Sequence, residues 1–144
     1  MYLVSACLIG INCRFDGNDS LSQRVMEFLD GKEFIPICPE QLGGLPTPRP
    51  PCRFYGGDGE SALRGEARLV NSDGVDVTEN FKRGAEEALK IARATKSTHA
   101  ILKERSPSCG TGEIYIDDGL ANGIGVTTAL FKKDGIEIIS DEEI

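Results

Sequence analysis

The 144-residue sequence lacks several features that would place it in a large class of proteins at once. No run approaches the roughly 18 to 20 apolar residues that a membrane-spanning helix requires. The first ten residues, MYLVSACLIG, lack the basic region that opens a signal peptide. No internal repeat, low-complexity tract or interdomain linker is present. These absences predict a single cytoplasmic domain over residues 1–144, long enough to bury a hydrophobic core.

An excess of positive charge is also missing. The 16 Lys and Arg residues are outnumbered by 23 Asp and Glu residues, which gives a net charge of −7. This balance argues against broad binding to nucleic acids or anionic membranes, because their phosphates favour a basic surface. A local basic patch stays compatible with the sequence, since Arg49, Arg53, Lys103 and Arg105 lie near cysteines along the chain. Nothing in the sequence signals an oligomeric state.

Strand-like apolar runs alternate along the chain with stretches of helical periodicity. Strands are expected for MYLVSAC, EFIPIC, THAILK and GIEIIS, and helices for LSQRVMEFLD, ENFKRGAEEALKIARAT and GIGVTTALFKK. Ser20 and Thr78 are the expected N-caps of the first two helices. The segments ARLVNSDGVDVT and GEIYIDD read as hairpins or single hairpin arms. The alternation predicts an α/β fold, a Rossmann-like layered domain with a mainly parallel sheet flanked by helices.

Proline is concentrated in one segment, PEQLGGLPTPRPPC, which holds five of the chain's seven prolines. Neither a helix interior nor a central strand tolerates that density, because proline lacks a backbone N–H and has a fixed φ. The sequence therefore predicts a stiff, extended loop from residue 39 to residue 52.

Three of the five cysteines, Cys7, Cys38 and Cys109, each follow a predicted strand. Ligands of open parallel sheets bind outside the carboxyl ends of the strands, and neighbouring strands lie about 4.8 Å apart. We therefore expect these three thiols to converge on one crevice. Cys13 and Cys52 come later in their loops, and no such convergence is expected for them.

The residues alone leave the chemistry of three converging thiols open. Structural zinc takes four protein ligands, often with C-x2-C spacing, which is absent here. The single histidine, His99, lies inside a predicted strand, where a structural role is more typical than ligation. An iron–sulfur cluster with one open iron is a second possibility, and a cysteine nucleophile lacks the usual neighbouring histidine. A three-thiol metal site and simply buried cysteines remain equal alternatives at this point.

Several motifs together resemble one known family. SACLIGINCRFDG at the start, ICPEQLGGLPTPRPP in the middle and LKERSPSCG after the third strand are similar to the DUF523 family, whose characterised members are thiouracil desulfidases. DVTENFKRGAEEAL and GIGVTTALFKKDGIEIIS resemble the same family. The resemblance therefore extends from the first predicted strand to the last.

The resemblance implies a non-redox removal of sulfur from thiolated uracil, which yields uracil and hydrogen sulfide. It also implies a 4Fe–4S cluster held by only three cysteines, Cys7, Cys38 and Cys109, with the open iron binding the substrate's sulfur. Cys13 and Cys52 are implied to be non-ligands. The expected partner is a small thiopyrimidine or its nucleotide. A thiolated tRNA as substrate, or a non-catalytic metal-binding module, are the alternatives.

Glu40, two residues after Cys38, is the candidate general acid or base, since desulfuration needs a water and protons near the carbon–sulfur bond. A carboxylate that only stabilises its loop is the plainer interpretation. Ser106 and Ser108 flank Cys109, and either hydroxyl could orient the substrate, relay a proton or cap a turn.

Two further residues are candidates for substrate binding. Asp16, in the segment RFDG, either contacts the substrate or shapes its own turn. Arg49, within the prolines, either anchors a phosphate or carbonyl of the substrate or pairs with a carboxylate.

Overall fold

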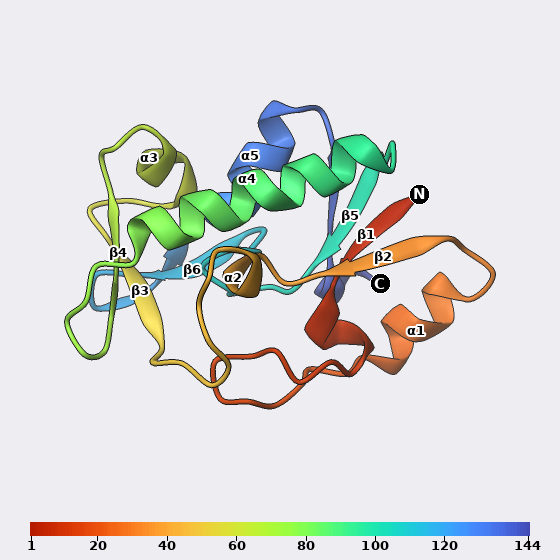
Figure 1. The fold of residues 1–144 in the computed structure, drawn as a ribbon, viewed down its shortest axis with the longest axis horizontal. Coiled ribbons are helices and arrows are strands. Elements are labelled where there is room, and N and C mark those ends of the chain that lie inside the picture. The colour runs from red at the N-terminus through yellow and green to blue at the C-terminus, as the bar shows by residue number, and fades with distance from the viewer.

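The computed structural model describes all residues 1–144 and places the strands in two four-stranded sheets (Figure 1). Sheet A contains β1 (Tyr2–Ser5), β2 (Phe34–Ile37), β5 (His99–Leu102) and β8 (Glu137–Ser140) in the order β2-β1-β5-β8, all parallel. Sheet B contains β3 (Cys52–Tyr55), β4 (Arg68–Asn71), β6 (Glu113–Ile116) and β7 (Gly119–Asn122) in the order β4-β3-β6-β7. Only its β3–β6 pair is parallel. The predicted α/β fold with a parallel sheet is confirmed.

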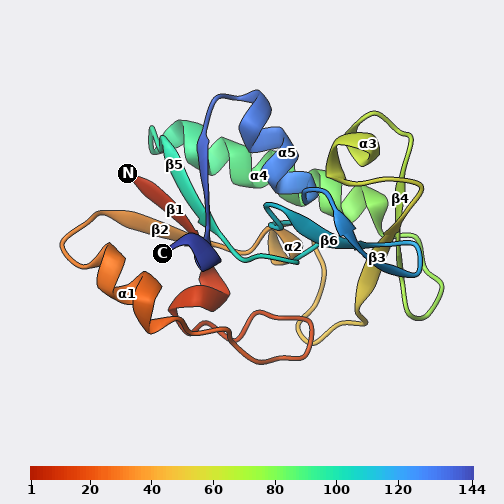
Figure 2. The ribbon, with the colours of Figure 1, turned by 180° about the vertical axis from the view of Figure 1, so that it is seen from behind.

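Helices flank both sheets. They are α1 (Gln23–Leu29), α2 (Pro39–Leu42), α3 (Gly59–Leu63), α4 (Thr78–Ala94) and α5 (Val126–Lys133), with 3-10 turns η1 (Ala6–Ile9) and η2 (Asp141–Glu143). The long helix α4 runs past both sheets, with α5 beside it (Figures 1 and 2). None of these helices combines the length and apolarity needed to cross a lipid bilayer.

The core follows the period-two alternation of the parallel strands. Leu3 of β1 and Leu102 of β5 pack with α4 and α5 on one face of sheet A. Val4 and Ile101, the neighbours of those residues, pack with α1 on the opposite face. A third cluster joins sheet B to α3 and to the first half of α4. Helix α4 thereby fixes the two sheets relative to each other.

The proline-rich segment differs from its prediction at one point. Residues Pro39–Leu42 form the single-turn helix α2 instead of extended chain. Pro39 occupies the first helical turn, where the missing N–H has no helical partner to lose and the fixed φ suits a helix. The later prolines lie in a loop that leads to β3, as expected.

Both predicted N-caps are wrong by one or two residues. Ser22 caps α1, since its Oγ accepts a hydrogen bond from Val25 N–H at 3.2 Å. Thr78 is the first residue of α4 instead of its cap. Its hydroxyl oxygen accepts a hydrogen bond from Leu69 N–H at 2.9 Å, which joins the helix start to β4. Ser22 thus makes a local helix cap, whereas a contact with β4 decides the use of Thr78.

Candidate functional site

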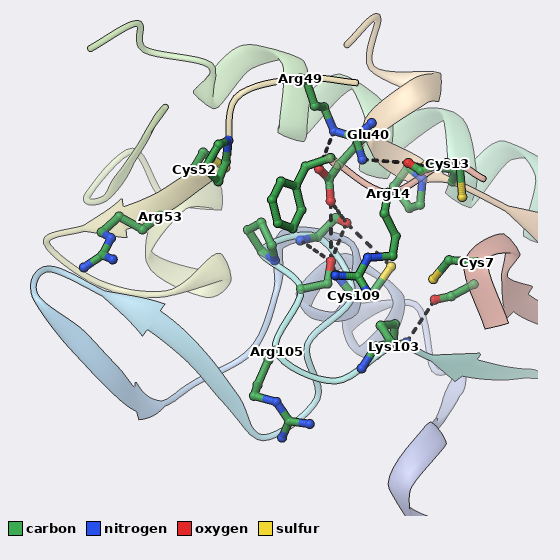
Figure 3. A pocket seen from close by; sticks show the side chains of 18 of the residues that line it. Cys7, Cys13, Arg14, Glu40, Arg49, Cys52, Arg53, Lys103, Arg105 and Cys109 are labelled. Atoms are coloured by element: carbon green, nitrogen blue, oxygen red, sulfur yellow. Dashed lines mark hydrogen bonds and ion pairs between the residues drawn. The ribbon is translucent and has the colours of Figure 1, made fainter. Parts of the chain in front are cut away.

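A cavity of about 590 Å³ opens at the carboxyl ends of the sheet A strands, between sheet A and sheet B (Figure 3). One wall comes from residues that end or follow β1, β2 and β5, and the opposite wall comes from β3, β4 and β6. This position agrees with the rule that ligands of parallel sheets bind beyond the carboxyl ends of the strands.

Three cysteines line this cavity as the strand-exit argument predicts. Cys7 lies in η1, two residues after β1, and Cys38 directly follows β2. Cys109 lies in the loop after β5, and its sulfur is oriented toward the same part of the cavity as that of Cys7 (Figure 3). Cys7 and Cys109 are buried, and Cys38 is half-buried.

Cys13 is a fourth thiol at the same end of the cavity, and the expectation that it would lie elsewhere is wrong. Cys13 packs with Cys7 and Cys38 in one cluster, and its backbone O accepts a hydrogen bond from Cys38 Sγ at 3.8 Å. Gly10, at φ +96°, turns the chain after η1 and brings Cys13 back. In the sequence, the glycine between Cys7 and Cys13 is the signal that the chain turns back and places the two cysteines near each other. Cys52 also lines the cavity, but from β3 on the other side (Figure 3).

The thiols of Cys13, Cys38 and Cys109 have raised pKa values and are protonated in the protein without metal. Burial raises the pKa of Cys109 to about 12. The hydrogen bond with Cys13, followed by burial, raises the pKa of Cys38 well above its usual range. For Cys13 the Cys38 thiol acts in the opposite direction, but the Cys7 thiol and burial outweigh it and raise the pKa to about 11. A metal group binding here must therefore displace protons.

Glu40, on α2, lines the cavity, and its carboxylate contacts Arg49 and two serines. Its Oε1 accepts a hydrogen bond from Arg49 Nε at 2.9 Å, in an ion pair whose side chains are only 13% and 5% exposed. Its Oε2 accepts hydrogen bonds from Ser108 Oγ at 3.0 Å and from Ser106 Oγ at 3.5 Å. Both carboxylate oxygens are thus fixed in direction.

Arg49 pairs with a carboxylate, which is one of the two roles considered for it. Its Nη1 donates to Pro46 O and Thr47 Oγ1, each at 3.1 Å, and its Nη2 donates to Cys13 O at 2.9 Å. These contacts join the proline-rich loop, the Cys13 loop and Glu40 at one planar group. The guanidinium is occupied on each edge, so its position suits orienting Glu40.

Ser106 and Ser108 connect Glu40 to Cys109. The two hydroxyl oxygens lie 3.0 Å apart, and Ser108 Oγ lies 3.6 Å from Cys109 Sγ. Ser106 Oγ also accepts hydrogen bonds from the N–H groups of Ser108 and Cys109, so it caps the turn as well. A continuous path of polar groups therefore runs from the carboxylate to the third cysteine.

Asp16 does not line the cavity. Its carboxylate forms an ion pair with Arg14 at 3.3 Å and accepts a hydrogen bond from Asn18 N–H at 3.0 Å. These contacts shape the turn between η1 and α1. A substrate contact by Asp16 stays an untested prediction.

Two glycines determine where α2, and with it Glu40, lies. A Cβ on Gly84 of α4 would stand 1.9 Å from Pro39 O, and a Cβ on Gly43 would stand 2.0 Å from Asn80 O. Only glycine permits this close approach of the two helix backbones. The packing of α2 against α4 thus places Cys38 and Glu40 together at the cavity.

Glu104 anchors the loop that carries Cys109. Burial alone would raise its pKa, but hydrogen bonds from Thr111 Oγ1 and from the N–H groups of Glu113, Gly112 and Thr111 lower it to about 2. Ser140 Oγ on β8 donates to the same carboxylate at 3.0 Å. The loop is therefore attached to sheet A at both of its ends.

The donor set fits a thiolate-bound group that is larger than one ion. No three His, Cys, Asp or Glu side chains lie close enough to hold a single metal ion. His99 lies at the amino end of β5, where it pairs with Glu137 at 2.9 Å, and it does not line the cavity. Cysteines spaced around a cavity are the donors that iron–sulfur clusters use, since thiolates hold each iron separately.

Comparisons with known proteins agree on one family. The family model described as 2-thiouracil desulfurase matches residues 2–143. The uncharacterized protein YbbK of Bacillus subtilis (strain 168) is 44% identical over 147 residues, covering 100% of this chain and 97% of its own length. A solved structure of the 4Fe–4S-dependent thiouracil desulfidase TudS superposes with a TM-score of 0.84 at 40% identity. That match covers 99% of this chain and 91% of the other.

Proposed function

We propose that this chain, which belongs to the 2-thiouracil desulfurase family, is an enzyme that removes the sulfur of a thiolated uracil by hydrolysis of the C–S bond. The observation that carries the proposal is the meeting of Cys7, Cys38 and Cys109 with Glu40 in one cavity. The net reaction consumes one water and yields uracil and hydrogen sulfide, with no change of oxidation state.

The similarity to a 4Fe–4S-dependent desulfidase supports such a cluster here as well, with Cys7, Cys38 and Cys109 as its three protein ligands. Bound there, the cluster would supply Lewis-acid chemistry toward the thiocarbonyl sulfur of the substrate. The three cysteines lie on three separate segments, which follow β1, β2 and β5. We also propose a cytoplasmic location, because the reducing conditions there would keep these thiols free to bind metal.

Glu40 is the proposed general base. Its Oε2 takes a proton from the water that attacks the C–S carbon, while Arg49 fixes Oε1 and offsets the negative charge. Ser108 receives that proton through its 3.0 Å contact and passes it, directly or through Ser106, toward the departing sulfur beside Cys109. Glu40 and the two serines thus serve both proton transfers.

A panel of 2-thiouracil, 4-thiouracil and 4-thio-UMP tests this function in anaerobically reconstituted protein. The proposal expects equal amounts of sulfide and pyrimidine product from at least one member of the panel. Bound iron without sulfide release from any of the three would favour a non-catalytic metal-binding module instead.

A thiouridine nucleotide is a second candidate substrate, because basic side chains line the cavity: Arg14, Arg53, Lys103 and Arg105. Three of them have carboxylate partners, namely Asp16, Asp141 and Glu142. Arg53 forms no ion pair and donates only to Asp117 O, at 2.7 Å. If a phosphate is bound, Arg53→Ala should raise KM for 4-thio-UMP about tenfold and leave KM for 4-thiouracil unchanged.

A further inference from the structure

The cavity holds two thiols more than a three-cysteine ligand set requires, Cys52 on the β3 wall and Cys13 on the wall that carries Cys7 and Cys38. Cys13 packs with Cys7 and Cys38 in one cluster, and Cys38 Sγ lies 3.8 Å from Cys13 O. The proposed reaction gives Cys13 no task. Two neighbouring thiols that share a cavity with solvent access can be joined by oxidation.

Cys13 and Cys38 differ in how easily a small molecule reaches them. Both line the cavity, but Cys38 is half-buried whereas Cys13 is only 2% exposed. An oxidant that enters the cavity therefore meets Cys38 first. Cys13 belongs to the segment between η1 and α1, which has no helix or strand, so a disulfide there would distort no regular element.

We propose that Cys13 and Cys38 form a redox-active pair in the metal-free protein, a modification site for small disulfide oxidants such as oxidised glutathione. The Cys38 thiolate attacks one sulfur of the oxidant, whose S–S bond breaks and releases one glutathione. The Cys13 thiolate then attacks the Cys38 sulfur and displaces the second glutathione. The two protein thiols lose two electrons and two protons, and the oxidant becomes two thiols.

The disulfide protects the site and blocks it at the same time. Cys38 in a disulfide cannot proceed to sulfinic or sulfonic acid, which are irreversible products. It also cannot bind iron until a thiol reductant restores it. This consequence rests on the proposed function, whereas the formation of the disulfide does not.

Counting free thiols in the full chain, prepared without iron, tests the pair. The protein is incubated with oxidised glutathione for several hours, because thiols with raised pKa values exchange slowly, and is then alkylated and weighed intact. Of the five cysteines, three should remain free in the monomer. Cys13→Ala and Cys13→Ser lack the second thiol, so each should stop at one glutathione on Cys38 with its other three cysteines free, while the control Cys52→Ala should keep only two free thiols and carry no glutathione.

Other results would overturn the pair. Five free thiols in the wild type, a stable glutathione adduct with no second thiol lost, or only two free thiols in Cys13→Ala each exclude it. Cys7→Ala identifies the partner: two free thiols support Cys38, and four free thiols would assign the disulfide to Cys7 and Cys13 instead. Circular dichroism before oxidation confirms that each variant is folded.

Iron loading separates this proposal from the proposed function. Oxidised wild type should bind iron and sulfide only after treatment with dithiothreitol, while wild type carried through the same steps without oxidised glutathione should bind them directly. If the thiol counts agree but neither sample binds iron after reduction, the cluster assignment fails and the redox pair stands. If oxidised wild type loads as readily as the untreated sample, the proposed block is refuted.

Discussion

Replacing Gly84 with alanine should displace the Glu40 carboxylate without adding an atom to the cavity. The added Cβ would stand 1.9 Å from Pro39 O, 2.9 Å from Pro39 C and 3.2 Å from Gly43 N, all of them backbone atoms. Widening the first contact to an ordinary 3.4 Å requires a movement of about 1.5 Å. Because α4 is long and buried, the short helix α2 is the element that moves.

This movement should affect both stability and rate. Alanine favours a helix interior over glycine by about 1 kcal/mol, but overpacking costs about 1 to 3 kcal/mol, and the second effect should win. Tm should fall by roughly 3 to 8 °C. Glu40 and Cys38 move with α2, and a displacement near 1 Å costs on the order of 100-fold in kcat.

Gly119→Ala is the matched control, because a Cβ there meets nothing within 4 Å. Thermal unfolding and steady-state sulfide release should show Gly119→Ala close to wild type and Gly84→Ala impaired in both. A Gly84→Ala protein with the Tm and kcat of Gly119→Ala would refute the claim that the contact of α2 with α4 places the carboxylate.

Three further changes test single contacts of the site. Arg49→Lys keeps a charge but loses the fork that holds Glu40 and Cys13 O, so kcat should fall roughly 10- to 100-fold with KM nearly constant; sulfide release at wild-type kcat would contradict the positioning role. Ser108→Ala interrupts the path from Glu40 to Cys109 and should lower kcat roughly 100-fold, with iron per chain unchanged; equal loss of iron and rate would show a structural effect instead. The pKa of Glu104 is about 2 when folded and 4.5 ordinarily, so its contribution of about 2 to 3 kcal/mol is present above pH 4.5 and is lost as the pH falls through 2. Urea unfolding between pH 6 and pH 2 should show this loss in the wild type and a flatter dependence in Glu104→Gln.

The parallel sheet and its cysteines could be read from the sequence because both depend on local patterns. Buried strands such as THAILK show as short apolar runs, and a residue directly after such a run must lie near the sheet edge. Cys38 follows β2 immediately, and its predicted position in the cavity rested on this placement alone.

Sheet B could not be read in the same way. β3 follows the prolines directly, and β7, with the sequence GLAN, has neither alternation nor β-branched residues. Its pairing with β6 comes from the tight turn at Asp117, which has a φ of 52°, and not from strand propensity. The strands β4 and β6 lie within the predicted hairpin segments, but β3 and the joining of these segments into a second sheet were absent from the prediction.

The contacts that orient Glu40 also depend on distances along the chain that no local pattern reports. Ser108 and Glu40 are 68 positions apart, and Arg49 reaches Cys13 across 36. The sequence indicated the residue types, and the roles of Arg49 and Asp16 stayed open between alternatives. In the structure, Arg49 forms an ion pair with Glu40. Both side chains are buried, and a buried charge needs a partner of opposite charge.

Iron content and sulfide release of Cys109→Ala, measured side by side with wild type and Cys52→Ala after anaerobic reconstitution, test the central claim most directly. With Cys109 as a cluster ligand, wild type and Cys52→Ala should bind about four irons per chain and release one sulfide per uracil formed. Cys109→Ala should lose most of both. A Cys109→Ala protein that lacks iron and still releases sulfide at the wild-type rate would contradict the claim.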